Sequence, residues 1–332
     1  MDPNQYTTRA HSLFFLFLTS IFIGLNYLGI SLADTSVNIL CLFLILTIGM
    51  SHGSLDNWKG NKLLKIYKIK SSYIFYLIYI LVALFVVALW LLLPSIALML
   101  FLIVASYHFG KEDSFVERLN WAAGEGPLSV LKKSDNLQFF LKGSIIVLAP
   151  LMFHFEETLS IFQTLLIEDI NFFYSDHVRG FLSVLFLISF FAGLNLFIET
   201  ACIIALNYFF SPLAAFTVYF CFLHSIRHLA SLVQDLEYEM GKKNKIPKRH
   251  FEVSINGRGA KTLFRKILPL TLITAVIFIL GIFLLTNYYN INDAILKVIF
   301  IGLASLTFPH ILLEYLIEKK LGSKKNFATQ KK

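Results

Sequence analysis

Apolar runs of about 20 residues recur from one end of this 332-residue chain to the other. Each run is long enough for a helix to cross a hydrocarbon core of roughly 30 Å. The strands of a membrane barrel would instead appear as alternating segments of roughly ten residues, which the sequence lacks. A hydrophobic fraction of 57%, including 34 phenylalanines, agrees with the helical pattern. The sequence therefore predicts an all-α, polytopic integral membrane protein.

The limits of the apolar runs predict about ten transmembrane helices, with eight as the lower limit. The predicted spans are 12–31, 37–51, 73–93, 95–110, 137–155, 180–197, 198–211, 212–233, 267–286 and 294–317. Polar loops are expected at 111–136, 156–179 and 234–266, and residues 159–167 have the composition of an interfacial helix. The whole chain, 1–332, is therefore interpreted as a single transmembrane helical domain.

The net charge of +8 comes from lysines that gather in short loops. With ten spans, the basic loops at 59–70 and 242–266 and both termini fall on one side, and the acidic loop at 156–176 falls on the other. Because positive loops stay in the cytoplasm, we expect a multi-pass protein of the cell (plasma or inner) membrane with both termini cytoplasmic. The charge is an orientation signal, so no nucleic-acid partner is expected.

Histidines inside the spans are the strongest indication of chemistry. His224 and His228 lie four residues apart, so one helix face can direct both imidazoles at one metal ion. The predicted topology places His52 and His108, at the ends of two other spans, in the same half of the bilayer. These four histidines predict a metal site between helices near the cytoplasmic half of the membrane. Ligand type alone leaves iron, copper, zinc and nickel open.

Carboxylates near the predicted ligands are candidates for supporting groups. Asp56 lies one helical turn beyond His52, and Glu112 and Asp113 lie one turn beyond His108. Each carboxylate is placed to accept the second ring N–H of the histidine that precedes it. His310 follows a proline that can kink its helix, and its role is open between a supporting or substrate-channel function and plain packing.

Other classes of protein compete with a catalytic metal site. A membrane haem protein, another metal-binding protein or a transporter with a histidine-lined path would also place histidines in spans. Each histidine taken alone is also explained by packing and a bond to a carbonyl group. The chain has no glycine-rich nucleotide motif, no P-loop and no serine-hydrolase motif, so those chemistries lack support.

The chain resembles the Brp/Blh-type β-carotene 15,15′-dioxygenases, membrane proteins associated with microbial rhodopsins. The matching segments are His52-Gly-x-x-Asp56, Tyr107-His108-Phe109-Gly110, His224-Ser-Ile-Arg-His228 and Phe308-Pro309-His310. Their order and spacing, the overall length and the polytopic character all agree, so the resemblance covers most of the chain.

The resemblance implies O₂-dependent cleavage of the central 15,15′ double bond of β-carotene to two molecules of all-trans-retinal. It implies Fe²⁺ as the cofactor, with His52, His108, His224 and His228 as ligands and no catalytic residue beyond them. The implied partners are β-carotene and O₂ as substrates, the lipid bilayer, and a functional link to a microbial rhodopsin. A neutral site of four imidazoles suits a ferrous ion, and a bilayer dissolves the substrate.

Overall fold

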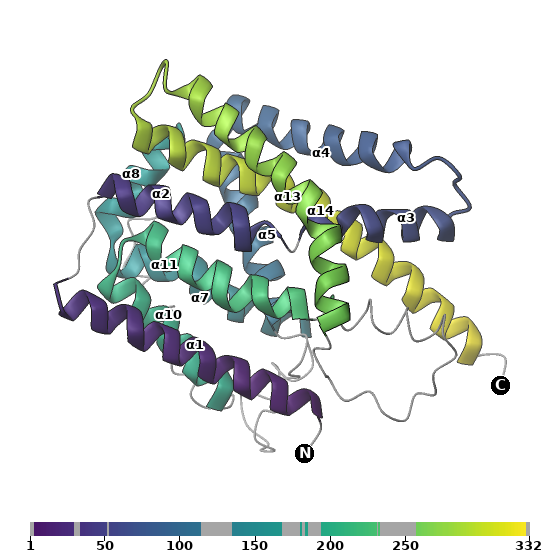
Figure 1. The fold of residues 1–332 in the computed structure, drawn as a ribbon, viewed down its shortest axis with the longest axis horizontal. Coiled ribbons are helices and arrows are strands. Elements are labelled where there is room, and N and C mark those ends of the chain that lie inside the picture. The colour runs from purple at the N-terminus through teal and green to yellow at the C-terminus, as the bar shows by residue number, and fades with distance from the viewer. Residues whose placement is uncertain are drawn as a thin grey trace.

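The computed structural model describes residues 3–29, 34–51, 53–113, 135–167, 194–230 and 257–329, together with residues 180, 183, 184 and 232. These residues form helices and contain no strand, which confirms the predicted all-α class. Figure 1 shows the long helices running side by side, with α1 along one edge of the molecule and α4 and α13 along the opposite edge.

The α-helices keep the order of the predicted spans. They are α1 (Pro3–Tyr27), α2 (Asp34–Leu44), α3 (Asp56–Ile66), α4 (Tyr73–Leu92), α5 (Pro94–Asp113), α7 (Asp135–Phe153), α8 (Phe155–Thr164), α10 (Leu194–Phe209), α11 (Pro212–Tyr219), α13 (Gly257–Leu285) and α14 (Ile291–Thr329). Short π-helical segments follow two of them, η1 (Ile45–Gly49) after α2 and η4 (Phe220–Ser225) after α11, and a 3₁₀ turn, η2 (Gly53–Leu55), precedes α3.

Seven helical stretches within the described residues are long and apolar enough to cross a membrane. An eighth is obtained if α7 and α8, which meet at an angle of 106°, count as one broken span. The polytopic prediction is therefore confirmed, but the predicted ten spans exceed this number. The predicted span at 198–211 corresponds to a shorter apolar helix, Leu196–Phe209, and the span at 180–197 lies mostly outside the described residues.

Several segments predicted as polar loops are helical. Helix α8 occupies the start of the predicted loop 156–179, and begins four residues before the interfacial helix that was expected at 159–167. Helix α3 occupies much of the basic segment 59–70, and α13 begins inside the predicted loop 234–266. Hydropathy places only the apolar part of a helix, so amphipathic or charged helical turns were missed. The rest of the loop 111–136, beyond the ends of α5 and α7, lies outside the described residues.

The helices differ in how much of their surface the protein covers. In the stretch 212–230, 67% of the most apolar window is buried inside the protein, against 11% in α4 and 17% in α13. The segment that carries His224 and His228 is thus central, whereas α4 and α13 present large apolar side chains outward. In a bilayer, those outward side chains face lipid.

Helices α5 and α7 approach closely at a pair of glycines. A Cβ atom on Gly110 would overlap the backbone of Phe139, and one on Gly143 would overlap the backbone of Ser106. Small residues at such crossings let two membrane helices pack backbone to backbone. The contact holds the C-terminal turn of α5, which carries His108, in a defined position.

The two π-helical segments contact each other in the interior. The Ser225 hydroxyl of η4 donates a hydrogen bond to the Gly49 carbonyl of η1 at 3.0 Å. A side chain on Gly49 would collide with the Phe220 ring, so glycine is required at this approach. Because π-helical turns are frequent at functional sites, their position beside the predicted ligands directs attention to this region.

Candidate metal centre

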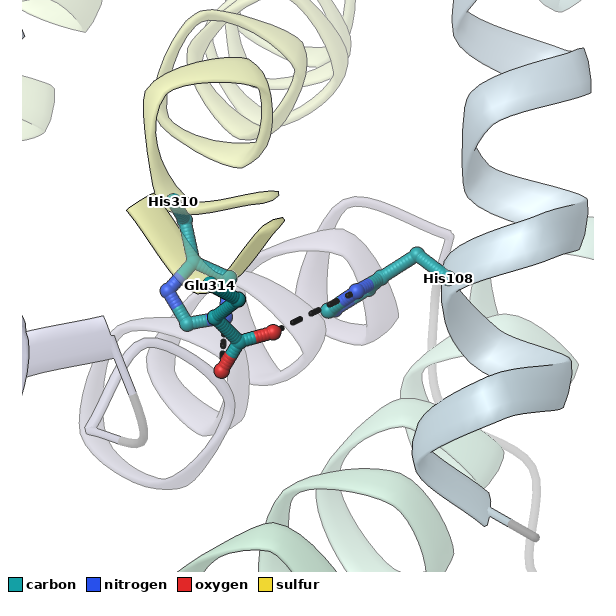
Figure 2. Close-up of side chains that lie close together, drawn as sticks. All are labelled: His108, His310 and Glu314. Carbon is teal, nitrogen blue, oxygen red and sulfur yellow. Dashed lines mark ion pairs between the residues drawn. The ribbon is translucent and has the colours of Figure 1, made fainter. Parts of the chain in front are cut away.

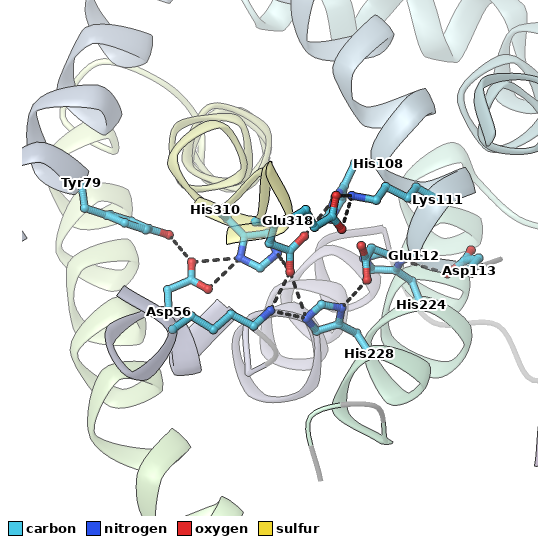
Figure 3. A network of polar contacts seen from close by, with 12 residues as sticks. Asp56, Tyr79, His108, Lys111, Glu112, Asp113, His224, His228, His310 and Glu318 are labelled. Carbon is cyan, nitrogen blue, oxygen red and sulfur yellow. Dashed lines mark hydrogen bonds and ion pairs between the residues drawn. The ribbon is translucent and has the colours of Figure 1, made fainter. Parts of the chain in front are cut away.

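Four buried histidines face one another where α5, η4 and α14 meet. The ring centroids are 5.4 Å apart for His108 and His224, and 5.4 Å apart for His108 and His310. His228 lies 5.7 Å from His310 and 6.5 Å from His224, which closes a ring of four imidazoles. We call these residues, His108, His224, His228 and His310, the histidine cluster (Figure 3).

The structure brings together three of the four predicted ligands, namely His108, His224 and His228. The fourth, His52, lies outside the described residues. His310, whose role the sequence left open, occupies the cluster on equal terms with the other three and is 4% exposed. Its position beyond Pro309 on α14 places it opposite His108.

Three of the imidazoles are hydrogen-bonded through Nδ1 to carboxylates at 2.8–3.0 Å. The pairs are His224 with Asp113, His228 with Glu112 and His310 with Asp56. An ionised carboxylate only accepts hydrogen bonds, so each imidazole donates from Nδ1 and carries its lone pair on Nε2. This arrangement is typical of histidines that bind metal ions, because the carboxylate fixes the tautomer and raises the basicity of the ligand nitrogen.

The carboxylates contact histidine nitrogens as the sequence suggested, but the pairs are different from those expected. Asp56 was expected to support His52 and instead contacts His310 of α14. Glu112 and Asp113 were expected to support His108 on their own helix, and they contact the two histidines on and just after η4. The reason is that η4 packs against the last turn of α5, so the carboxylates of that turn point across the interface.

Glu314 and Lys59 are polar members of the site that the sequence analysis did not assign. The Glu314 carboxylate lies 4.0 Å from His108 Nδ1 and 3.5 Å from His310 Nε2 (Figure 2). It is also 3.7 Å from His228 Nε2 and forms an ion pair with Lys59 at 2.6 Å. The sequence did contain a signal for Glu314. It follows His310 by one helical turn, and an acidic residue in an apolar span is costly unless it has a function.

Among the described residues of the site, negative side chains outnumber positive ones. With neutral imidazoles, the carboxylates of Asp56, Glu112 and Glu314 face one ammonium group, that of Lys59. Two negative charges are left without a cation in a buried region, where an uncompensated charge is expensive. The two positive charges of a bound divalent cation would balance these two negative charges. The donor atoms also fit, because His108, His310 and Glu314, and likewise Glu112, His228 and Glu314, offer ligand atoms within 4.8 Å of one another.

A second group of buried charges lies next to the histidine cluster, and we call Arg227, Glu199, Lys142 and Asp113 the Arg227 cluster. Arg227 pairs with Glu199 at 2.7 Å, and Lys142 pairs with the same carboxylate at 3.3 Å. The Arg227 guanidinium also donates to the Asp113 carbonyl at 2.7 Å. These bonds hold the end of α5, so the Arg227 cluster positions the carboxylate that contacts His224.

A largely apolar cavity of about 140 Å³ adjoins the histidine cluster. His108, His224 and His310 form part of its wall. Away from the histidines it extends between α4 and α13, where Tyr76 and Leu270 belong to its lining. Since α4 and α13 are among the least covered of the described helices, this end of the cavity is the one nearest to lipid.

The fold and the site define a polytopic helical membrane protein whose interior holds a carboxylate-supported histidine cluster of the kind that binds a metal ion. The sequence model of the beta-carotene 15,15′-dioxygenase family matches residues 43–318 of the chain. The chain therefore belongs to this family of oxidoreductases and is an enzyme.

A relative from the uncultured marine bacterium 66A03, described as a beta-carotene 15,15′-dioxygenase, is 27% identical over 283 residues. The similarity covers 82% of this chain and 90% of the relative. No solved structure is significantly similar to the chain.

Proposed function

We propose that this enzyme uses O₂ to cleave the central 15,15′ double bond of β-carotene into two molecules of retinal, with ferrous iron bound at the histidine cluster. The observation that carries the proposal is the closed ring of four buried imidazoles with carboxylates at three Nδ1 atoms. The family membership and the description of the relative from bacterium 66A03 supply the reaction.

The proposed ligands are those predicted from the sequence, His52, His108, His224 and His228, with His310 added to them. His310 has the same burial and the same carboxylate contact as His224 and His228, which distinguishes a ligand from a packing residue. His52 remains a prediction from the sequence. Glu314 lies among the imidazoles and supplies a negative charge beside the ion.

The side chains of the site have distinct tasks. Asp113, Glu112 and Asp56 hold three imidazoles in the tautomer that presents Nε2. Lys59 neutralises part of the charge of Glu314. The apolar wall of the adjoining cavity binds the hydrocarbon and excludes water. Iron, when bound, supplies the O₂ activation that protein side chains cannot provide.

The membrane setting suits both substrate and product, because a carotenoid and retinal dissolve in lipid. The cavity end between α4 and α13 is the proposed entrance from the bilayer. We retain the cell membrane, with cytoplasmic termini, as the proposed location on the strength of the basic loops. A microbial rhodopsin as consumer of the retinal remains an expectation from the family resemblance.

The test is to express the chain in bacteria that make β-carotene and to measure retinal in extracts and iron in the purified protein. The wild type should lose carotenoid colour and yield retinal. His108→Ala, His228→Ala and His310→Ala should each abolish retinal formation and lower bound iron. The matched control is His154→Ala, because His154 lies at the α7–α8 bend and pairs with Glu157 outside the cluster.

Unchanged β-carotene in cells with well-expressed wild-type protein would refute the cleavage reaction. An intense Soret absorption band in the purified protein would show haem and refute the non-haem site. If His310→Ala kept its iron and its activity, His310 would be a packing residue and the ligand set would return to the four predicted histidines.

A further inference from the structure

A second apolar cavity, of about 80 Å³, lies behind the histidine cluster. It is enclosed by α5, α7, α8, α10 and α11, with Ala105, Ile146, Ile203 and Ala215 in its wall. None of the four histidines lines it, and the reaction as described so far does not use it. Among the described residues, Phe109 alone lines both cavities.

The two cavities are separated by a wall of aromatic rings. The Phe109 ring lies 4.8 Å from the His224 ring, centroid to centroid, and 6.2–6.3 Å from Phe220 and Phe216. Phe220 belongs to the lining of the first cavity and Phe216 to that of the second. These two rings are stacked at 5.3 Å with an angle of 11° between their planes. The rings of Phe109, Phe216 and Phe220 thus lie between the two cavities.

The histidine cluster lies at the inner end of the first cavity, against this wall. His108 precedes Phe109 directly, and His224 contacts its ring. From there the first cavity leads outward between α4 and α13. A symmetric substrate that is cut at its central bond needs room on both sides of the bound ion. The first cavity offers room on the side of the entrance, and the second cavity is the space beyond.

We propose that the second cavity binds the distal half of the substrate, a polyene arm with an apolar terminal ring, and that Phe109 rotates to join the two cavities. The inference rests on the proposed cleavage of a carotenoid. Both cavities are smaller than the arms that they receive, so the aromatic wall opens when substrate enters. The depth of the second cavity then sets how far the substrate slides in, and thereby which bond stops at the ion.

The experiment compares two substrates in variants that fill the second cavity. Leu102 is half-buried and lines this cavity, whereas Leu100 on the same helix is 42% exposed and does not. Leu102→Trp and the matched control Leu100→Trp are assayed with β-carotene and with an apocarotenal that keeps one ring and has its other arm shortened. Val147→Trp fills the cavity from α7 and serves as a second variant if Leu102→Trp does not fold.

Filling the cavity should lower kcat/KM for β-carotene by about tenfold or more, and lower that for the shortened substrate by about twofold or less. The Leu100→Trp control should leave both values unchanged. Equal losses for both substrates in a folded variant would overturn the proposal, and would show that the cavity serves O₂ or packing only. No loss for either substrate would also overturn it. Iron-loaded wild-type protein that cleaves neither substrate would instead refute the proposed function itself.

Discussion

The interior of the protein holds two groups of charged side chains that share Asp113 but differ in their balance. In the Arg227 cluster two cations, Arg227 and Lys142, both pair with the Glu199 carboxylate and donate to the Asp113 backbone carbonyl, and the Asp113 carboxylate supplies the second negative charge. Among the described residues in and around the histidine cluster, three carboxylates face the ammonium of Lys59, while the nearby Lys111 is paired with Glu318. The first group is complete as a protein structure. With neutral imidazoles, a divalent cation would balance the second group, and this difference distinguishes a structural group of charges from a candidate metal site.

The two groups are connected, which gives the four buried charges of the Arg227 cluster a role beside the candidate metal site. The Arg227 guanidinium binds the Asp113 backbone, and the Asp113 carboxylate binds His224 Nδ1. Tyr219 donates a further hydrogen bond to the same carboxylate at 2.5 Å. The Arg227 cluster therefore holds Asp113 in place, and Asp113 orients His224 of the histidine cluster.

The largest expected effect on stability comes from removing a cation of the Arg227 cluster. Arg227→Met should lower the free energy of unfolding by about 3–5 kcal/mol, because it leaves Glu199 buried with fewer partners. The loss should be larger with iron bound than without it, because Arg227 also holds the residue, Asp113, whose carboxylate orients His224. The measurement is a denaturant titration in mixed micelles.

Lys111→Met is the matched control for this variant. Lys111 also pairs with a glutamate, but that partner, Glu318, has a side chain that is 57% exposed. The control should cost about 1 kcal/mol or less. If both variants lost a similar free energy of unfolding, burial of the Arg227–Glu199 pair would not increase its contribution to stability.

Removal of the metal should have the next largest effect, and only on the unbalanced group. With free Fe²⁺ at 100 times its dissociation constant, bound iron should stabilise the folded protein by about 2.7 kcal/mol. A chelator should therefore lower the unfolding temperature of the wild type. His108→Ala protein should unfold at one temperature with or without chelator. A chelator effect that survives in His108→Ala would place the stabilising ion elsewhere.

The smallest effect should come from the groups that only orient a ligand. Asp56→Asn keeps the shape of the side chain that contacts His310 and removes its charge, so iron affinity should fall about 10- to 100-fold. Tyr79→Phe removes only the hydroxyl that donates a hydrogen bond to Asp56 at 2.8 Å. Its loss should weaken the free energy of iron binding by at most the value of one hydrogen bond, about 0.5–1.5 kcal/mol. Competition with a chromogenic chelator measures both. An Asp56→Asn protein with wild-type affinity would show that His310 needs no carboxylate.

The positions of the apolar helices could be predicted from the sequence because hydropathy is a local property. The predicted spans 73–93 and 95–110 correspond closely to α4 and α5, and 137–155 corresponds to α7. Helix α3 was missed and α8 was predicted only in part, as an interfacial helix at 159–167, because their residues carry charge. Their presence depends on what the rest of the protein packs against them.

The pairing of polar side chains could be predicted only in part. The four-residue spacing of His224 and His228 was visible in the chain, and the two rings do lie in one cluster. The partners of Glu112 and Asp113 were assigned to the wrong histidines, because spacing along one helix says nothing about which helix faces it. The role of His310 was left open and that of Glu314 was not considered for the same reason: each is a single residue whose neighbours come from other helices.

The π-helical segment η4 has a consequence for how such a site can arise. A π turn holds about one more residue than an α turn, so η4 has one residue more than a regular helix of the same rise would hold. Deleting one residue between 220 and 223 would leave a regular helix with its downstream register restored, yet His224 would be rotated away from His108. One residue thus separates a regular membrane helix from one that directs both His224 and His228 into the histidine cluster. The reverse change offers the protein family a short route to losing its chemistry while keeping its fold.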